Sequence, residues 1–163
     1  MKSLRKRWIG EGGAIALRQL QRMLLKRDPV GQERVGAALG RMVYRVSKKR
    51  YERALWNLAL AMPELSEAER IRIARACAEH FGIVFADSLT LGKRSREHLL
   101  ESVSVTGVEV VEEALSLGKG ALLVTGHLGS WDRMAAWASA KGYKVRPVAR
   151  DADAPGMTKL LNE

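Results

Sequence analysis

The run Ala-Leu-Leu-Val-Thr at residues 121–125 is the feature that most constrains the fold. Gly120 and Gly126 bound this run, and its apolar residues are consecutive rather than alternating. A strand that is apolar on both sides is typical of a parallel sheet with helices on both faces. We therefore expect residues 121–125 to form a buried β-strand.

Two other segments have the composition of strands. They are 103–107 and 143–149, and Pro147 places the second near a sheet edge because proline lacks the backbone donor that a central strand needs. Short helices are expected at 108–117 and 131–141. Strands that alternate with helices predict an α/β fold, with a partial, largely parallel sheet flanked by helices and preceded by a helical N-terminal region.

The N-terminal half has helical periodicity throughout. Apolar residues recur at helical spacing in 35–46, and a further helix is expected at about 51–62, ending before Pro63. Ser66 and Glu69 have the S-x-x-E spacing of a capping box, which predicts the start of a long helix that ends near Gly92. The single cysteine, Cys77, excludes an intramolecular disulfide and is expected to be a small buried residue of that helix.

Positive charge is concentrated in the first third of the chain. The formal net charge is +10, and residues 1–53 carry 15 Lys/Arg against four Asp/Glu, a net +11. The remaining 13 basic and 14 acidic residues give −1. A basic segment favours a polyanionic partner. We therefore divide the chain into a basic, amphipathic, membrane-associating region at 1–53 and a second region at 54–163.

The first basic helix permits three interpretations. Its leucines and its cations fall on different sides: Leu17, Leu20, Leu24 and Leu25 against Arg18, Arg22, Lys26 and Arg27. Such a helix can lie in a membrane interface, pack on its own domain or bind nucleic acid. Nucleic acid is disfavoured because aromatic residues are few and no recognised motif is present. No stretch approaches the length of about 18 apolar residues that a spanning helix needs.

The turn after the expected strand carries candidate catalytic residues. His127 follows its carboxyl end, where α/β sheets bind ligands, and Asp132 falls in the first turn of the next helix. A carboxylate that orients an imidazole makes it a general base for a hydroxyl. The alternative is structural: Asp132 only supports the helix N-terminus, and His127 only bonds to backbone.

Other chemistries fit this turn poorly. Ser130 is not in a G-x-S-x-G elbow, which argues against a serine hydrolase. One histidine and one aspartate fall short of a metal site, so no metal is expected. The glycine spacing also lacks the G-x-G-x-x-G pattern of dinucleotide binding, and no bound cofactor is expected.

The stretch GKGALLVTGHLGSWDRMAAW (118–137) resembles the signature of the lipid A biosynthesis acyltransferases, the lauroyl- and myristoyl-transferase type. The wider lysophospholipid acyltransferase superfamily is marked by H-x-x-x-x-D or H-x-x-x-x-E, here His127 to Asp132. The lipid A branch usually has Glu at the acidic position and Asn before the tryptophan, where this chain has Asp132 and Ser130. RALWNLALAMPELSEAERIRIA (53–74) is similar to the upstream helical region of that family. The resemblance spans roughly residues 35 to 163 and corresponds to the N-terminal half of a family member.

The resemblance implies an activity and roles for five residues. A fatty acyl group would pass from an acyl carrier protein or coenzyme A thioester to a hydroxyl of a lipid A precursor or related lipid. His127 would be the general base and Asp132 its orienter, backbone N–H groups at Gly129 and Ser130 would stabilise the oxyanion, and Arg150 would hold a phosphate. The expected place is the cytoplasmic face of the inner membrane, on anionic lipid. The alternative is a non-catalytic basic module, binding membrane or nucleic acid, with a vestigial dyad.

Overall fold

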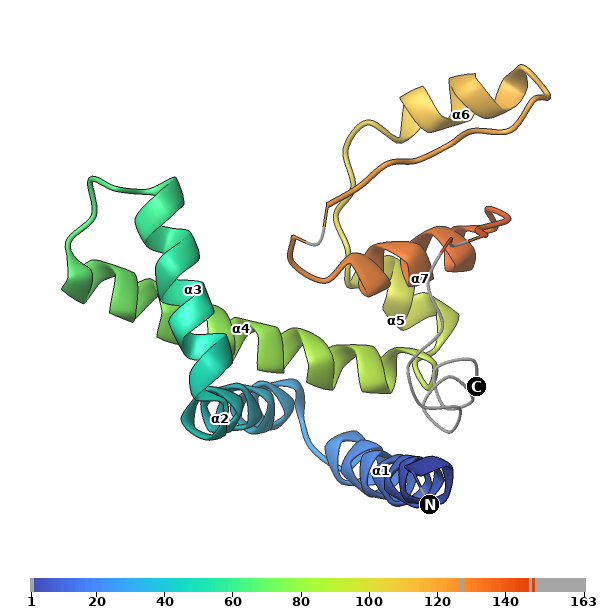
Figure 1. The fold of residues 1–163 in the computed structure, drawn as a ribbon. Coiled ribbons are helices and arrows are strands. Elements are labelled where there is room, and N and C mark those ends of the chain that lie inside the picture. The colour runs from blue at the N-terminus through green and yellow to red at the C-terminus, as the bar shows by residue number, and fades with distance from the viewer. Residues whose placement is uncertain (1, 127, 147, 149–163) are drawn as a thin grey trace. The chain divides into compact units, whose positions relative to one another are not determined.

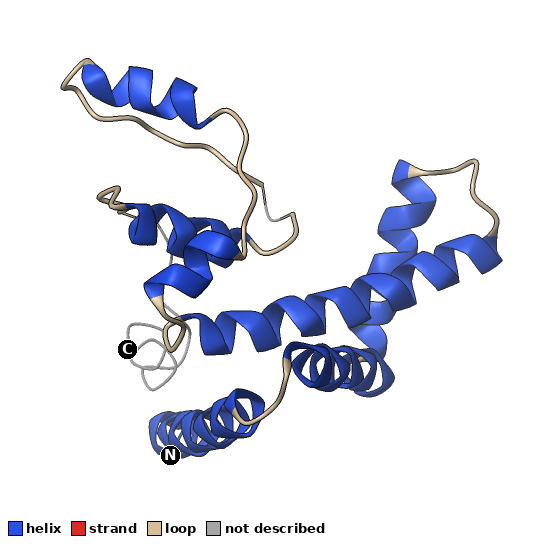
Figure 2. Ribbon diagram, turned by 180° about the vertical axis from the view of Figure 1, so that it is seen from behind, coloured by secondary structure: helices blue, strands red, loops and turns tan. Residues whose placement is uncertain are grey.

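The computed structural model describes residues 2–126, 128–146 and 148, with side chains from Gly12 onward. Two compact units are present, one containing the chain up to Gly92 and the other comprising Lys93–Arg146. Both units are helical (Figures 1 and 2). The first unit contains α1 (Lys2–Leu25), α2 (Pro29–Val46), α3 (Lys48–Ala61) and α4 (Glu67–Leu91), and the second contains α5 (Arg96–Glu101), α6 (Val108–Ser116) and α7 (Trp131–Lys141).

Local capping groups determine where α2 and α4 begin. The carboxylate of Asp28 accepts a hydrogen bond from the backbone N–H of Gly31 at 2.9 Å, and proline occupies the first helical position of α2. At the start of α4, Ser66 and Glu69 form the expected capping box. The long helix expected from Ser66 to Gly92 is therefore confirmed.

Glycines allow α2 and α4 to pack backbone against backbone (Figure 1). A Cβ atom at Gly36 would lie 2.7 Å from the carbonyl oxygen of Gly82, and one at Gly40 would collide with the carbonyl group of Ala78. Only a residue without a side chain fits such an approach. The closely packed side of α4 therefore carries small residues, and Cys77 is exposed, contrary to the expectation that it is buried.

The C-terminal half of α1 packs on α4. The side-chain amide of Gln21 donates a hydrogen bond to the carbonyl oxygen of Leu89 at 2.6 Å. The apolar cluster at this contact consists of the buried residues Leu24, Ala86 and Leu89, with Leu17, Leu20 and Val35 packed against them. Leu17, Leu20 and Leu24 of the predicted amphipathic stripe therefore pack on the protein itself, whereas Leu25 is exposed. For these three leucines, the interpretation that the helix packs on its own domain is confirmed.

In the second unit, α7 is held by contacts at its C-terminal end. The Nε atom of Arg96, in α5, donates a hydrogen bond to the carbonyl oxygen of Ala140 at 2.7 Å. The rings of Trp137 and Tyr143 lie with their centroids 6.5 Å apart, and the Tyr143 hydroxyl donates to the carboxylate of Glu112, in α6, at 3.1 Å. These contacts join the three helices of the unit.

The predicted parallel sheet is wrong for the part of the chain that the structure describes, which contains helices and loops but no β-strand. Residues 103–107 are a loop, and 121–126 run as an extended segment back beside α6 in both views (Figures 1 and 2). At 143–145 a local hydrogen bond from the Val145 N–H to the Tyr143 carbonyl, at 3.0 Å, replaces strand geometry. A strand requires a neighbouring strand for its backbone groups, and none of these segments has one among the described residues. The division at residues 53 and 54 stays a prediction.

Candidate active site

The turn that leads into α7 is built as a helix entry. Gly129 has φ +62°, in the left-handed region that favours glycine, and it is exposed. Ser130 is the N-cap residue, and the helix begins at Trp131. The helix that the sequence predicted at 131–141 is confirmed, and Gly142, in the left-handed region, ends it.

Asp132 lies in the first turn of α7 and is half-buried. Backbone N–H groups without helical partners point out of this turn, and the helix dipole favours a negative charge there. The same position suits a carboxylate that orients an imidazole next to the N-terminus of the helix. Sequence and structure therefore agree on the element that positions Asp132.

Two of the predicted site residues, His127 and Arg150, lie outside the described residues. The structure brings Gly129, Ser130 and Asp132 together at the N-terminus of α7. The approach of His127 to Asp132 and the role of Arg150 stay predictions.

The extended segment before the turn is exposed, where the sequence predicted burial. Leu122 is 88% exposed, Leu123 70% and Val124 86%, and Leu128 in the turn is 90% exposed. Apolar side chains on both sides of this segment therefore face solvent. Surfaces of this kind mark places where proteins associate.

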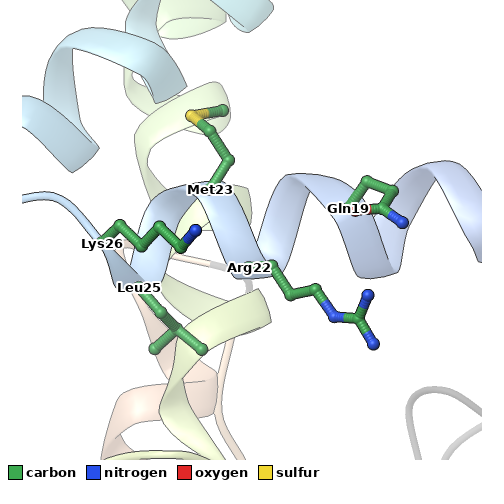
Figure 3. A pocket seen from close by; sticks show the side chains of 5 residues that line it. All are labelled: Gln19, Arg22, Met23, Leu25 and Lys26. Carbon is green, nitrogen blue, oxygen red and sulfur yellow. The ribbon is translucent and has the colours of Figure 1, made fainter.

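A hollow of about 580 Å³ lies at the C-terminal end of α1, lined by residues of this helix and by Lys26, which follows it (Figure 3). Its lining residues are Gln19, Arg22, Met23, Leu25 and Lys26. In the close-up, Arg22 and Leu25 project from one side of the helix and Met23 from the other. The hollow contains none of the motif residues, so it does not belong to the candidate active site.

Neither a metal centre nor a membrane span is found in the described residues. Within them, no three or more His, Cys, Asp and Glu side chains gather as metal ligands would. No helix there combines the length and the apolar character needed to cross a bilayer.

One exposed surface was not singled out by the sequence patterns. Trp56 and Leu60 of α3 are 64% and 69% exposed and lie one helical turn apart. Their helical spacing to the exposed Lys49 and Arg53 is the signal in the sequence that could have found this surface.

Comparison with known proteins identifies the family. The sequence model described as "Bacterial lipid A biosynthesis acyltransferase" matches residues 3–163. The chain is 29% identical over 136 residues to the lipid A biosynthesis myristoyltransferase of Escherichia coli (strain K12) and, to the same extent, to lipid A biosynthesis acyltransferase 1 of Shigella flexneri. Each alignment covers 83% of this chain and 41% of the relative, so the chain spans less than half the length of these relatives. No solved structure gives a significant match. The chain belongs to the bacterial lipid A biosynthesis acyltransferase family.

Proposed function

We propose that this chain takes part in transferring a fatty acyl group from an acyl thioester to a hydroxyl of a lipid A precursor or a related lipid. The family match over residues 3–163 is the observation that carries the proposal. The H-x-x-x-x-D spacing from His127 to Asp132 supports it, as does the position of Asp132 in the first turn of α7. The donor is a thioester of acyl carrier protein or coenzyme A.

In the proposed mechanism His127 accepts the proton of the acceptor hydroxyl while Asp132 orients the imidazole. The hydroxyl oxygen attacks the thioester carbonyl carbon and forms a tetrahedral intermediate. The intermediate collapses to the new ester, the carbon–sulfur bond breaks, and the thiolate takes the proton from His127. No acyl-enzyme forms, and no metal or bound cofactor takes part.

The entry of α7 supplies a place for the oxyanion. Backbone N–H groups near Gly129 and Ser130 lie at a helix N-terminus, where the dipole stabilises developing negative charge. A glycine with positive φ leaves this approach free of a side chain. Arg150 is assigned to a phosphate of the acceptor or donor.

The basic N-terminal third is proposed to keep the protein on anionic lipid at the cytoplasmic face of the inner membrane. Each Lys or Arg near such a surface contributes about 1 kcal/mol. The net +11 of residues 1–53 is the supporting observation. Since Leu17, Leu20 and Leu24 pack on α4, charge rather than those leucines must supply the attraction along α1.

The dyad is tested by substitution. His127→Ala should lower the rate of acyl transfer to a lipid acceptor by about 10²–10⁴-fold, the range for loss of a general base. Asp132→Asn should also lower the rate, whereas Asp132→Glu should retain most of it because the carboxylate remains. The measurement is transfer of a radiolabelled acyl chain from a thioester donor to vesicle-borne acceptor, with folding checked by circular dichroism.

His98→Ala is the matched control. His98 is an exposed histidine on α5 and has no place in the mechanism, so the rate should not change. Undiminished transfer by His127→Ala would exclude the dyad. If the unmodified chain shows no transfer but binds anionic lipid or nucleic acid, the non-catalytic alternative is favoured.

A further inference from the structure

The solvent side of α3 carries a row of two cations and two large apolar residues. Lys49, Arg53, Trp56 and Leu60 are separated by four, three and four positions, which places them on one side of a helix. All four are exposed. We call them the α3 face.

The opposite side of α3 is packed, so the direction of the α3 face is fixed within the first unit. α3 contacts both α2 and α4 (Figure 1). The half-buried Tyr51 meets Tyr44 of α2 edge-on, with ring centroids 5.7 Å apart. Leu55 and Leu58 are also half-buried, whereas the α3 face is turned to solvent.

We propose that the α3 face lies in the interface of an anionic membrane, with Trp56 and Leu60 at the boundary of the acyl chains and Lys49 and Arg53 on lipid phosphates. Tryptophan is enriched at this depth because its ring is amphipathic. Long cationic side chains keep their charge at the headgroups while their stems cover apolar surface. The face carries no acid among its four residues, and the neighbouring Glu52 pairs with Lys48 at 3.6 Å.

A lipid surface explains the α3 face better than a protein partner does. The face is one exposed helix side on which two long cationic side chains lie beside a tryptophan and a leucine, so it can meet lipid phosphates and the acyl-chain boundary at the same time. Protein interfaces instead concentrate their apolar anchors at a desolvated centre from which charged residues are depleted. This inference names the surface by which the protein would contact the membrane proposed above. It rests on that proposal for the anionic lipid, but it does not depend on acyl transfer.

The test places an environment-sensitive fluorophore on the α3 face of the full chain. Cys77 is the only cysteine, so Cys77→Ser combined with Leu60→Cys gives one labelling site. The matched control combines Cys77→Ser with Val110→Cys: Val110 is 64% exposed, on a helix that carries three acids and no cation. Both proteins are mixed with phosphatidylglycerol/phosphatidylcholine vesicles and with phosphatidylcholine vesicles.

On anionic vesicles the emission at position 60 should shift to the blue and rise, and the emission at position 110 should not change. Lys49→Gln with Arg53→Gln should weaken vesicle binding about 30-fold, the loss of two surface cations. Lys141→Gln with Lys144→Gln changes the net charge equally on exposed sites of the second unit and should leave binding unchanged.

Three results would overturn the proposal. If the protein binds vesicles without a change in emission at position 60, the α3 face is excluded as the inserted surface, but the basic region at 1–53 remains the membrane anchor. If the protein does not bind vesicles at all, both the α3 face and the basic region are excluded. A change at position 60 that an acidic carrier protein produces and vesicles do not would assign the face to a protein partner. An Asp132→Asn chain that loses acyl transfer and keeps the response at position 60 separates the two proposals.

Discussion

At the scale of single residues, the pair Ser66–Glu69 contributes a cap whose strength depends on pH. The Ser66 hydroxyl accepts from the Glu69 N–H at 3.3 Å, and the Glu69 carboxylate accepts from the Ser66 hydroxyl at 2.7 Å and from its N–H at 2.9 Å. These hydrogen bonds hold the pKa of Glu69 below its ordinary value of 4.5. A lowered folded pKa stabilises the fold above pH 4.5, and this contribution is lost as the pH falls through the folded pKa.

Ser66→Ala should therefore lower the free energy of unfolding by about 1 kcal/mol at neutral pH, because it removes the N-cap side chain. The difference from the unmodified chain should shrink as the pH falls from 4.5 through the lowered folded pKa, because Glu69 then becomes protonated and no longer makes a charged cap. Urea unfolding followed by circular dichroism, at neutral pH and at a pH well below 4.5, measures this difference in unfolding free energy. Glu69→Gln is the control, since it removes the titration and should remove the pH-dependent part. A difference that is equal at both pH values would contradict this account.

The same residues show what sequence alone predicts at this scale. The capping box was predictable because both partners are three positions apart and need no tertiary contact. Cys77 was predicted to be a small buried residue of α4, yet it is exposed. The side that packs closest holds Ala78 and Gly82 instead, since α2 approaches too closely for larger side chains. The partner of a helix decides which of its sides is buried.

At the scale of elements, the crossing of α2 and α4 is the packing that a single methyl group should disturb most. Gly36→Ala and Gly40→Ala each place a Cβ atom against backbone of α4, which cannot yield as a flexible side chain would. Each should lower the free energy of unfolding by about 1–3 kcal/mol, the usual cost of overpacking. Thermal and urea unfolding of the purified chain measure the change.

Gly92→Ala supplies the comparison for this prediction. A Cβ atom at Gly92 has nothing within 4 Å, and its φ of −65° suits alanine. Its stability should match or exceed that of the unmodified chain, because alanine restricts the unfolded state. Equal stabilities for Gly36→Ala, Gly40→Ala and Gly92→Ala would contradict the close crossing.

Helices were predictable from the sequence where strands were not, and the reason is physical. A helix satisfies its backbone hydrogen bonds within its own segment, so its ends depend on local residues. Ser66 caps the start of α4, and Gly142 ends α7. The apolar run at 121–125 has the composition of a strand, but a strand satisfies its backbone groups only through a partner. The position of Asp132 on α7 was likewise predictable from local pattern, whereas its distance to His127 depends on the fold of the turn.

At the scale of the whole molecule, the uncovered apolar segment at 121–126 should make the chain self-associate. Leu122 and Val124 are almost fully exposed, and the extended backbone between them has no strand partner among the described residues. An apolar segment with β-forming residues and free backbone groups is a template for pairing with another copy. Leu122→Lys with Val124→Lys should therefore lower association and raise solubility, while helix content stays the same. Sedimentation velocity over rising protein concentration measures the association.

Val110→Lys separates this effect from a general gain in charge. Val110 is also exposed, but it lies on α6, whose backbone groups bond within the helix. If association depends on the extended segment, Val110→Lys should change it much less than the double substitution at 122 and 124. A monomer at every concentration, or an equal effect of the two variants, would contradict this account. Because backbone pairing needs an extended chain and apolar contact does not, the comparison also tells whether strand formation, rather than apolar surface alone, drives the association.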